Sequence, residues 1–328
     1  MKHKLPIIIT MGDPAGIGPE VILQSFTSSD VNQLPIVVYG DFSIMELFKQ
    51  QLQIDSFALK RISSLEEFRF NEQVLHVLDF DVVDMATYQM GQLSATCGEA
   101  AYQYIVGAIQ SVKDSTARGV VTAPINKEAL HLAGHLYPGH TEIFAEFTGS
   151  NDYAMLLYDD QLSVIHVSTH VALSEAIERV TATRLEQVIE LAATNIEKIK
   201  GRPAKIAVAG LNPHASENGL FGDKERLVIE PVIHKLKHKF NVIGPVSPDS
   251  VFARGLKKEY DIVVAMYHDQ GHIPFKLYAF DSGVNTSVGL PITRTSVDHG
   301  TAFDIAGKGI ANFNSMIAAI LLNDKLSS

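Results

Sequence analysis

The chain has 328 residues, which is long for a single core and predicts two domains; 46% of its residues are hydrophobic and 20% are charged, as in globular proteins. The formal net charge of −10 argues against a nucleic-acid-binding surface, and no apolar run reaches the roughly 18 residues of a membrane-spanning helix. The single cysteine, Cys97, excludes an internal disulfide and predicts a reducing, cytoplasmic location.

Short aliphatic runs alternate with longer segments of helical periodicity along the chain. We expect strands at 6–10, 35–40, 119–124, 153–158, 162–168, 205–210 and 261–267, and helices at 19–26, 98–112, 182–200 and 223–236. Most of the strands are almost continuously apolar, as in strands covered on both faces. The alternation predicts an α/β fold with a largely parallel sheet.

Polar clusters follow five of these expected strands. In parallel α/β sheets ligands bind beyond the carboxyl ends of the strands. The clusters at those ends are TMGDPAGIGPE (10–20), TAPINKE (122–128), STH (168–170), LNPHASENG (211–219) and MYHDQGH (266–272). Their recurrence at equivalent positions indicates an enzyme.

The first cluster is a glycine-rich turn between a strand and a helix, where a helix N-terminus can hold an anion. It lacks the GK[ST] of a Walker A loop, and Val21 stands where the third glycine of a GxGxxG fingerprint would be. A purely structural turn and a functional turn both remain open. A nicotinamide site of the usual Rossmann type is not predicted.

Three histidines lie at the ends of expected strands: His170, His214 and His268. Three histidines that leave open positions are a recognised site for a catalytic divalent ion. Their wide separation in the sequence does not prove a shared site, so separate roles remain open. His166 lies inside an apolar strand, and we expect it to point into packing.

Other residues suit an anionic ligand. PGHTE (138–142) places His140 and Thr141 at the start of a helical pattern, either to bind an anion or as an ordinary N-cap provided by Thr141. Lys276, Asn285 and Arg294, on successive strand or loop ends, form either a phosphate clamp or three unrelated surface groups. DHGTAFDIAGKGIAN (298–312) is rich in small residues and reads as a ligand-binding loop.

Seven motifs in order, GDPAGIGPE, TAPINK, PGHTE, STH, NPHA, YHDQG and RTSVDHGTAFDIAGKG, resemble the 4-hydroxythreonine-4-phosphate dehydrogenases of vitamin B6 (pyridoxine) biosynthesis. The resemblance covers nearly the whole chain. It implies the isocitrate/isopropylmalate dehydrogenase-like fold, with two α/β lobes around a central cleft and a mostly parallel sheet. We expect an NAD-associated lobe from residues 1–137 with 296–328, and a metal-binding and dimerisation lobe from residues 138–295.

The resemblance also implies roles for individual residues. His170, His214 and His268 would bind one divalent ion (Zn, Mg, Mn or Co), the third coming from the other subunit of an obligate homodimer. The phosphorylated substrate would be held by His140, Thr141, Lys276, Asn285 and Arg294, with Asp249 nearby, and NAD by His299, Gly300, Thr301 and Asp304. Asp269 and Lys276 are the catalytic candidates.

The implied reaction is NAD- and metal-dependent oxidation of the C3 hydroxyl of a four-carbon 4-phosphorylated acid, followed by decarboxylation. The stretches around STH, NPHA and YHDQGHIPFKL resemble more closely a sister group that acts on 4-phospho-D-threonate and 4-phospho-D-erythronate and yields dihydroxyacetone phosphate. His272, in HDQGHIP where the B6 enzymes tend to have HDQGLP, is a candidate marker of that group. The substrate therefore stays open between the two. A metal-dependent phosphosugar hydrolase or lyase and a phosphosugar-binding protein are the alternatives.

Overall fold

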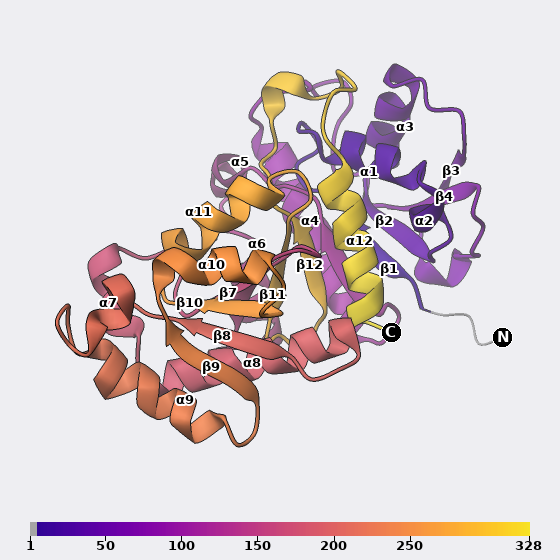
Figure 1. The fold of residues 1–328 in the computed structure, drawn as a ribbon. Helices are drawn as coiled ribbons and strands as arrows, with labels where there is room; N and C mark the ends of the chain where they lie inside the picture. Colours follow the sequence, from indigo (N-terminus) through magenta and orange to yellow (C-terminus); the bar gives the residue numbers. More distant parts are fainter. Residues whose placement is uncertain (1–4) are drawn as a thin grey trace. The chain divides into compact units, whose positions relative to one another are not determined.

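The computed structural model describes residues 5–328, so the first four residues of the first expected lobe lie outside it. The chain divides into two compact units: unit 1 comprises the residues up to Asn151 together with Leu290–Ser328, and unit 2 comprises Asp152–Gly289 (Figure 1). Within the described residues, no helix is long and apolar enough to cross a membrane.

Among the described residues of unit 1, six parallel strands lie in the order β3-β4-β2-β1-β5-β12. The strands are β1 (Ile7–Thr10), β2 (Ile36–Gly40), β3 (Ala58–Ile62), β4 (Val74–Asp79), β5 (Gly119–Thr122) and β12 (Arg294–Val297). The helices are α1 (Gly18–Phe26), α2 (Ser29–Asn32), α3 (Phe42–Gln51), α4 (Ala95–Lys113), α5 (Lys127–Leu132), α6 (His140–Thr148) and α12 (Asn314–Leu326), with 3-10 turns at Leu65–Glu67 and Phe303–Ile305.

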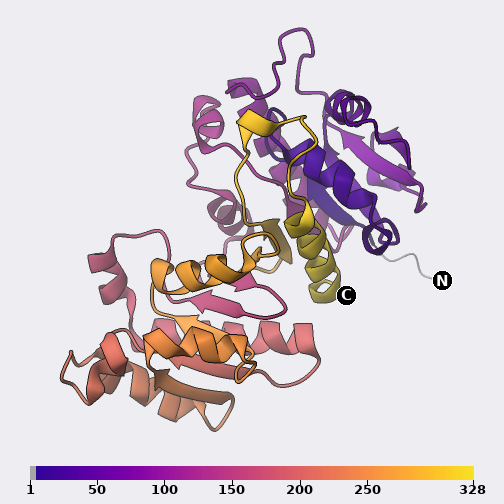
Figure 2. The ribbon, with the colours of Figure 1, turned by 45° about the horizontal axis from the view of Figure 1, so that its top comes forward.

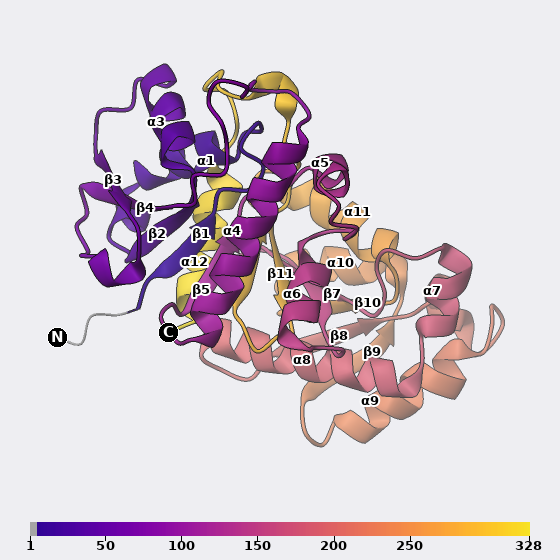
Figure 3. The same cartoon turned by 180° about the vertical axis from the view of Figure 1, so that it is seen from behind.

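Helices cover both faces of the unit 1 sheet, which explains why β1, β2 and β5 are buried along their whole length. α12 lies in front of the strands in Figure 1, and α4 lies in front of them in the reverse view of Figure 3. Figure 2 shows α12, in yellow, beside α1, in indigo, so the first and last helices pack together. The buried Glu20 of α1 accepts a hydrogen bond from the Ala311 N–H just before α12 (3.0 Å).

Unit 2 contains six strands in the order β11-β6-β7-β10-β8-β9, antiparallel at β11-β6-β7 and parallel in the remainder. The strands are β6 (Ala154–Tyr158), β7 (Ser163–His166), β8 (Lys205–Ala209), β9 (Asn241–Val246), β10 (Ile262–Ala265) and β11 (Val284–Val288). The helices are α7 (Leu173–Arg179), α8 (Ala182–Lys200), α9 (Glu230–Leu236), α10 (Pro248–Leu256) and α11 (His268–Ala279), with a 3-10 segment at Pro213–Glu217 and a π-helical turn at Glu225–Ile229.

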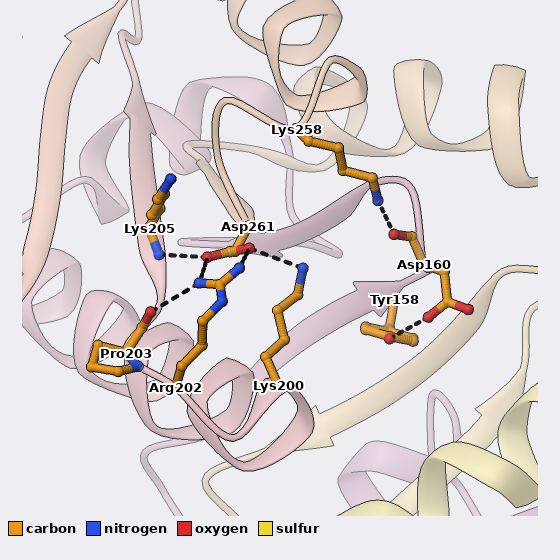
Figure 4. A network of polar contacts seen from close by, with 8 residues as sticks. All are labelled: Tyr158, Asp160, Lys200, Arg202, Pro203, Lys205, Lys258 and Asp261. Atoms are coloured by element: carbon orange, nitrogen blue, oxygen red, sulfur yellow. Dashed lines mark hydrogen bonds and ion pairs between the residues drawn. The ribbon is translucent and has the colours of Figure 1, made fainter.

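An ion-pair network ties β10 to β8 at their amino ends. The buried carboxylate of Asp261 accepts hydrogen bonds from Arg202 (2.8 Å), Lys200 (2.9 Å) and the backbone N–H of Lys205 (2.8 Å) (Figure 4). Burial raises the pKa of Asp261, but these hydrogen bonds outweigh it and hold the pKa well below its ordinary value.

The predicted fold class is confirmed as α/β with a mostly parallel sheet. The division by internal contacts differs from the expected lobes at residues 138–151 and 290–295, which fall in unit 1 rather than in the second lobe. The reason is packing within unit 1, since α6 contacts α4 and β12 pairs with β5.

Candidate active site

The five polar clusters do follow the carboxyl ends of β1, β5, β7, β8 and β10. MYHDQGH runs from the end of β10 into α11, which begins at His268. Arg294 begins β12 and so lies at a strand end, whereas Lys276 lies inside α11 and Asn285 inside β11. His170, His214, Asp249, His268, Asp269, Lys276 and Asn285 belong to unit 2, and His140, Thr141, Arg294, His299, Gly300, Thr301 and Asp304 belong to unit 1.

In unit 2, His170 and His268 lie close together, with 5.7 Å between ring centroids. They line a pocket of about 480 Å³ together with Thr169, Tyr267 and Asp269. The Nδ1 of His268 lies 2.7 Å from Oδ1 of Asp269. Because a carboxylate accepts hydrogen bonds, Nδ1 carries the proton and Nε2 keeps the lone pair that a metal ion requires.

His272 and His166 continue this histidine cluster into the core. The ring of His272 stacks on that of His268 at 3.7 Å, and its Nδ1 lies 3.1 Å from Nε2 of His166. Burial lowers the pKa of His166 to about 3 and that of His272 to about 4. His166 does point into packing, as expected, but its partner is a polar ring.

His214 lies on a backbone segment of unusual conformation. The five residues from His214 to Asn218 all have left-handed φ values, between 46° and 64°, although none is glycine. The buried Glu225 holds the segment, because its carboxylate accepts hydrogen bonds from the backbone N–H of Asn212 (2.7 Å) and from its side chain (2.9 Å). Strain of this kind concentrates at functional sites.

Asp249 lies near His214. A hydrogen bond from Ser247 lowers the pKa of Asp249, burial opposes that effect, and the charge of His214 lowers the pKa further. Among residues 5–328, no three His, Cys, Asp or Glu side chains of one chain gather closely enough to hold a metal ion. A single chain therefore brings together His170 and His268 but does not add His214 to them. The His170–His268 pair, with Nε2 of His268 available, fits part of a divalent-ion site.

In unit 1, the buried Arg294 lies near the half-buried His140. Arg294 is 3% exposed, donates hydrogen bonds to Oγ1 of Thr122 (3.2 and 2.8 Å), and stacks over the ring of Phe144. Burial lowers the pKa of Arg294 to about 10, against the opposing charge of Glu142. Such a guanidinium suits a phosphate.

His140 is the first residue of α6, and its Nε2 is buried without a hydrogen-bond partner. Burial, and then the positive charges of Arg294 and Lys127, hold the pKa of His140 well below its ordinary value. The N-cap position is Gly139, so the ordinary N-cap that sequence analysis offered for Thr141 is wrong. A buried nitrogen without a hydrogen-bond partner, at a helix N-terminus, is consistent with an anion site.

The loop proposed for NAD packs on the first glycine-rich loop. The carbonyl of Thr301 accepts a hydrogen bond from the Ile17 N–H (2.9 Å), and a Cβ on Gly16 would lie only 2.8 Å from that carbonyl oxygen. Gly16 is therefore required by close backbone approach. The two loops lie almost 300 residues apart in the sequence, and the fold brings them into contact.

Sequence analysis did not single out Thr122 or Lys127, although both lie in TAPINKE, one of the five strand-end clusters. Only their proximity to Arg294 and His140 identifies them. In unit 2, Asn285 has a buried Oδ1 without a hydrogen-bond partner, which marks it as a ligand candidate.

The chain matches the family model described as pyridoxal phosphate biosynthetic protein PdxA over residues 32–323. It is 45% identical to D-threonate 4-phosphate dehydrogenase of Salmonella typhimurium, with 98% of each chain covered, and 44% identical to 4-hydroxythreonine-4-phosphate dehydrogenase of Beijerinckia indica, with 96% of this chain and 93% of that one covered.

Among solved structures, the crystal structure of 4-hydroxythreonine-4-phosphate dehydrogenase from Klebsiella pneumoniae is similar with a TM-score of 0.88 and 42% identity, covering 99% of this chain and 100% of that one. The motif resemblance is thus confirmed over the full length. The chain belongs to the PdxA family and is an oxidoreductase, of the kind named 4-hydroxythreonine-4-phosphate or D-threonate 4-phosphate dehydrogenase.

Proposed function

We propose that the chain oxidises 4-phospho-D-threonate at its C3 hydroxyl, with NAD as the acceptor and a divalent ion bound by histidines, and that decarboxylation follows. Several relatives at 39–46% identity carry the D-threonate 4-phosphate dehydrogenase name or its provisional form. 4-Phospho-D-erythronate, the epimer of this acid at C2, is a related candidate. The relative from Beijerinckia indica favours 4-phosphohydroxy-L-threonine as the second candidate substrate.

The observation that carries the metal-dependent part is the His170–His268 pair in the unit 2 pocket, with Asp269 on Nδ1 of His268. The ion would polarise the C3 oxygen, and NAD would take up the hydride. In this role Asp269 holds the proton of His268 and keeps Nε2 directed to the ion. Asp269 also remains, with Lys276, the candidate for moving the hydroxyl proton.

The phosphate would be bound by Arg294, His140 and Thr141, with Lys276 and Asn285 as further contacts. This assignment is supported by the buried guanidinium of Arg294 and by the buried Nε2 of His140, which has no hydrogen-bond partner. Their role is to orient C3, because fixed geometry at the reacting carbon lowers the entropic part of the barrier. We assign NAD to His299, Gly300, Thr301 and Asp304, on the loop that packs against the first glycine-rich loop.

We further propose that the active form is a homodimer in which the metal site includes a ligand from each chain. One chain brings only two of the three predicted histidines together, and α11 carries an apolar stripe. Ile273 is 58% exposed, Leu277 84% and Phe280, which directly follows α11, 73%, at the i, i+4, i+7 spacing of one helix face. An exposed apolar stripe on the helix whose first residues line the pocket is typical of an interface. The single, buried Cys97 fits a reducing cytoplasm.

The test compares NADH formation from 4-phospho-D-threonate, 4-phospho-D-erythronate and 4-phosphohydroxy-L-threonine, before and after removal of metal by a chelator. We expect the hydroxy acid to react faster, with dihydroxyacetone phosphate as product, and activity to return when Zn, Mg, Mn or Co is added. A preference for the amino substrate would make the chain a vitamin B6 enzyme. Full activity in metal-free buffer would overturn the metal assignment.

A further inference from the structure

His272 lies between the proposed metal ligand His268 and the core residue His166. Its ring is parallel to that of His268, with 3.7 Å between centroids and 13° between planes. It is only 8% exposed, and its Nδ1 lies 3.1 Å from Nε2 of His166 and 3.2 Å from the carbonyl oxygen of His268. His272 therefore contacts one face of the ligand ring and is itself held at its edge through Nδ1.

The hydrogen bonds of the neutral His166 and His272 rings fix which ring nitrogen of each carries the proton. Nδ1 of His166 faces the carbonyl oxygen of Met155 (3.3 Å), and Nδ1 of His272 faces that of His268. Carbonyl oxygens only accept, so both Nδ1 atoms are N–H donors, and Nε2 of His166 is left to accept from His272. The chain of hydrogen bonds then runs in one direction, from His272 through His166 to the backbone of β6.

The backbone of α11 at Gly271 packs tightly against β7, next to the His166–His272 pair. A Cβ on Gly271 would lie 2.4 Å from Nε2 of His166 and 2.7 Å from Val164, so only glycine lets α11 come this close to β7. The close approach brings the ring of His272 within reach of His166. With Asp269 on the edge of His268 and His272 on its face, the ring is fixed from two directions.

We infer that His272, held by His166, is a positioning residue that orients the imidazole of His268 toward a divalent ion. The inference rests on the metal site of the proposed function. Partners of this kind, beyond the ligands themselves, change metal affinity by about 10–100-fold. If His272 served packing alone, a leucine of similar size would replace it without effect on the metal.

The test uses the full-length chain and three variants: His272→Leu removes the ring, His272→Phe keeps a flat ring without the hydrogen bond, and His234→Leu removes an exposed histidine of α9 as a control. Zn²⁺ affinity is measured by competition with a chromophoric chelator, and the absorption spectrum of bound Co²⁺ reports ligand geometry. Imidazole NMR of the metal-free protein reports the ring-current shift and tautomer of His268.

We expect His272→Leu to weaken Zn²⁺ binding by about 10-fold or more and to alter the Co²⁺ spectrum. His272→Phe should lie between His272→Leu and the unchanged chain, and His234→Leu should match the unchanged chain. Equal binding by all four would overturn the inference and leave the metal site standing. Failure of the unchanged chain to bind either ion would overturn the metal site as well. If His272→Leu does not fold, the metal-free spectrum decides: absence of a ring-current shift on His268 in the unchanged chain refutes the stacking.

Discussion

The carboxylate of Glu225 bridges the backbone N–H and the side-chain amide of Asn212, at 2.7 and 2.9 Å, and so anchors the left-handed turn that carries His214. Glu225 is fully buried, so both of its oxygens depend on these partners. The turn keeps five successive non-glycine residues at positive φ, a conformation that is unfavourable for each. Without the anchor, the turn would relax.

Replacing Glu225 by alanine should lower the free energy of unfolding by about 1–3 kcal/mol, because two partly buried donors of Asn212 lose their acceptor. We also expect Zn²⁺ affinity to fall, since His214 loses its fixed position. Chemical denaturation and metal titration measure the two effects. Glu217→Ala, an exposed change in the same turn, is the control. A variant that lost stability but kept full metal affinity would show that His214 does not depend on the turn.

Asp13 in the first glycine-rich loop predicts a pH effect. Its carboxylate is fully buried; burial raises its pKa from 3.8 to about 6, against a smaller lowering by the hydrogen bond from the Ala15 N–H. A pKa raised in the folded state means that the stability contributed by the protonated acid is complete below about pH 4 and is lost as pH rises through about 6.

Asp13→Asn keeps the acceptor for Ala15 and removes the ionisation. Relative to the unchanged chain, its free energy of unfolding should be similar near pH 4 and higher above pH 6, by up to about 3 kcal/mol. Urea denaturation at acidic, neutral and alkaline pH measures this. Asp30→Asn, an exposed aspartate of α2, is the control. A difference between Asp13→Asn and the unchanged chain that is the same at every pH would contradict the assignment.

Asp261 predicts the opposite pH dependence. Its pKa is lowered in the folded state, so its stabilising contribution is present at neutral pH and is lost as pH falls below the ordinary range of an aspartate. Asp261→Asn should cost about 2 kcal/mol of unfolding free energy at neutral pH, and less in acid.

A matched control for this change is Asp223→Asn, which removes an exposed ion pair with Arg226. Such a surface pair contributes at most about 1 kcal/mol. Thermal unfolding of both variants, measured across the acidic pH range, distinguishes the two stability losses. Equal losses of stability for Asp261→Asn and Asp223→Asn would mean that the network of Figure 4 stabilises the fold no more than an exposed ion pair does.

Arg294 predicts a substrate effect. Arg294→Lys keeps a positive charge but loses the planar fork that bonds Thr122 and suits a phosphate. We expect KM for the phosphorylated substrate to rise about tenfold or more, with a smaller change in kcat. Arg254→Lys, at an exposed ion pair, is the control. Steady-state kinetics measure both, and an unchanged KM would remove Arg294 from the phosphate site.

The apolar stripe of α11 predicts the oligomeric state. Leu277→Glu places a charge on its most exposed member and should convert a dimer to monomers with loss of activity. Analytical ultracentrifugation gives the mass. Leu136→Glu, at a similarly exposed leucine of unit 1 (78%), is the control and should leave the dimer intact. A dimer that survived Leu277→Glu would place the interface elsewhere.

Periodicity and motif order in the sequence determined much of this protein. Helix α8 has the bounds that its apolar spacing predicts, and the buried strands β1, β2, β5, β7, β8 and β10 were recognisable as apolar runs. Motif order alone also identified the family. Strands β3, β4, β9, β11 and β12 were missed. β3 and β9 are the outer strands of their units and β11 carries polar residues, so they lack a continuous apolar signal.

Only the tertiary structure determined how distant residues act together. His166 and His272 are 106 residues apart, and the meeting of their rings depends on β7 pairing with β10, which places the start of α11 beside β7. The left-handed turn at His214 depends likewise on a glutamate that follows it in the chain and folds back beneath it. Periodicity reports which face of an element is apolar, whereas these contacts depend on sheet order, which no local pattern encodes.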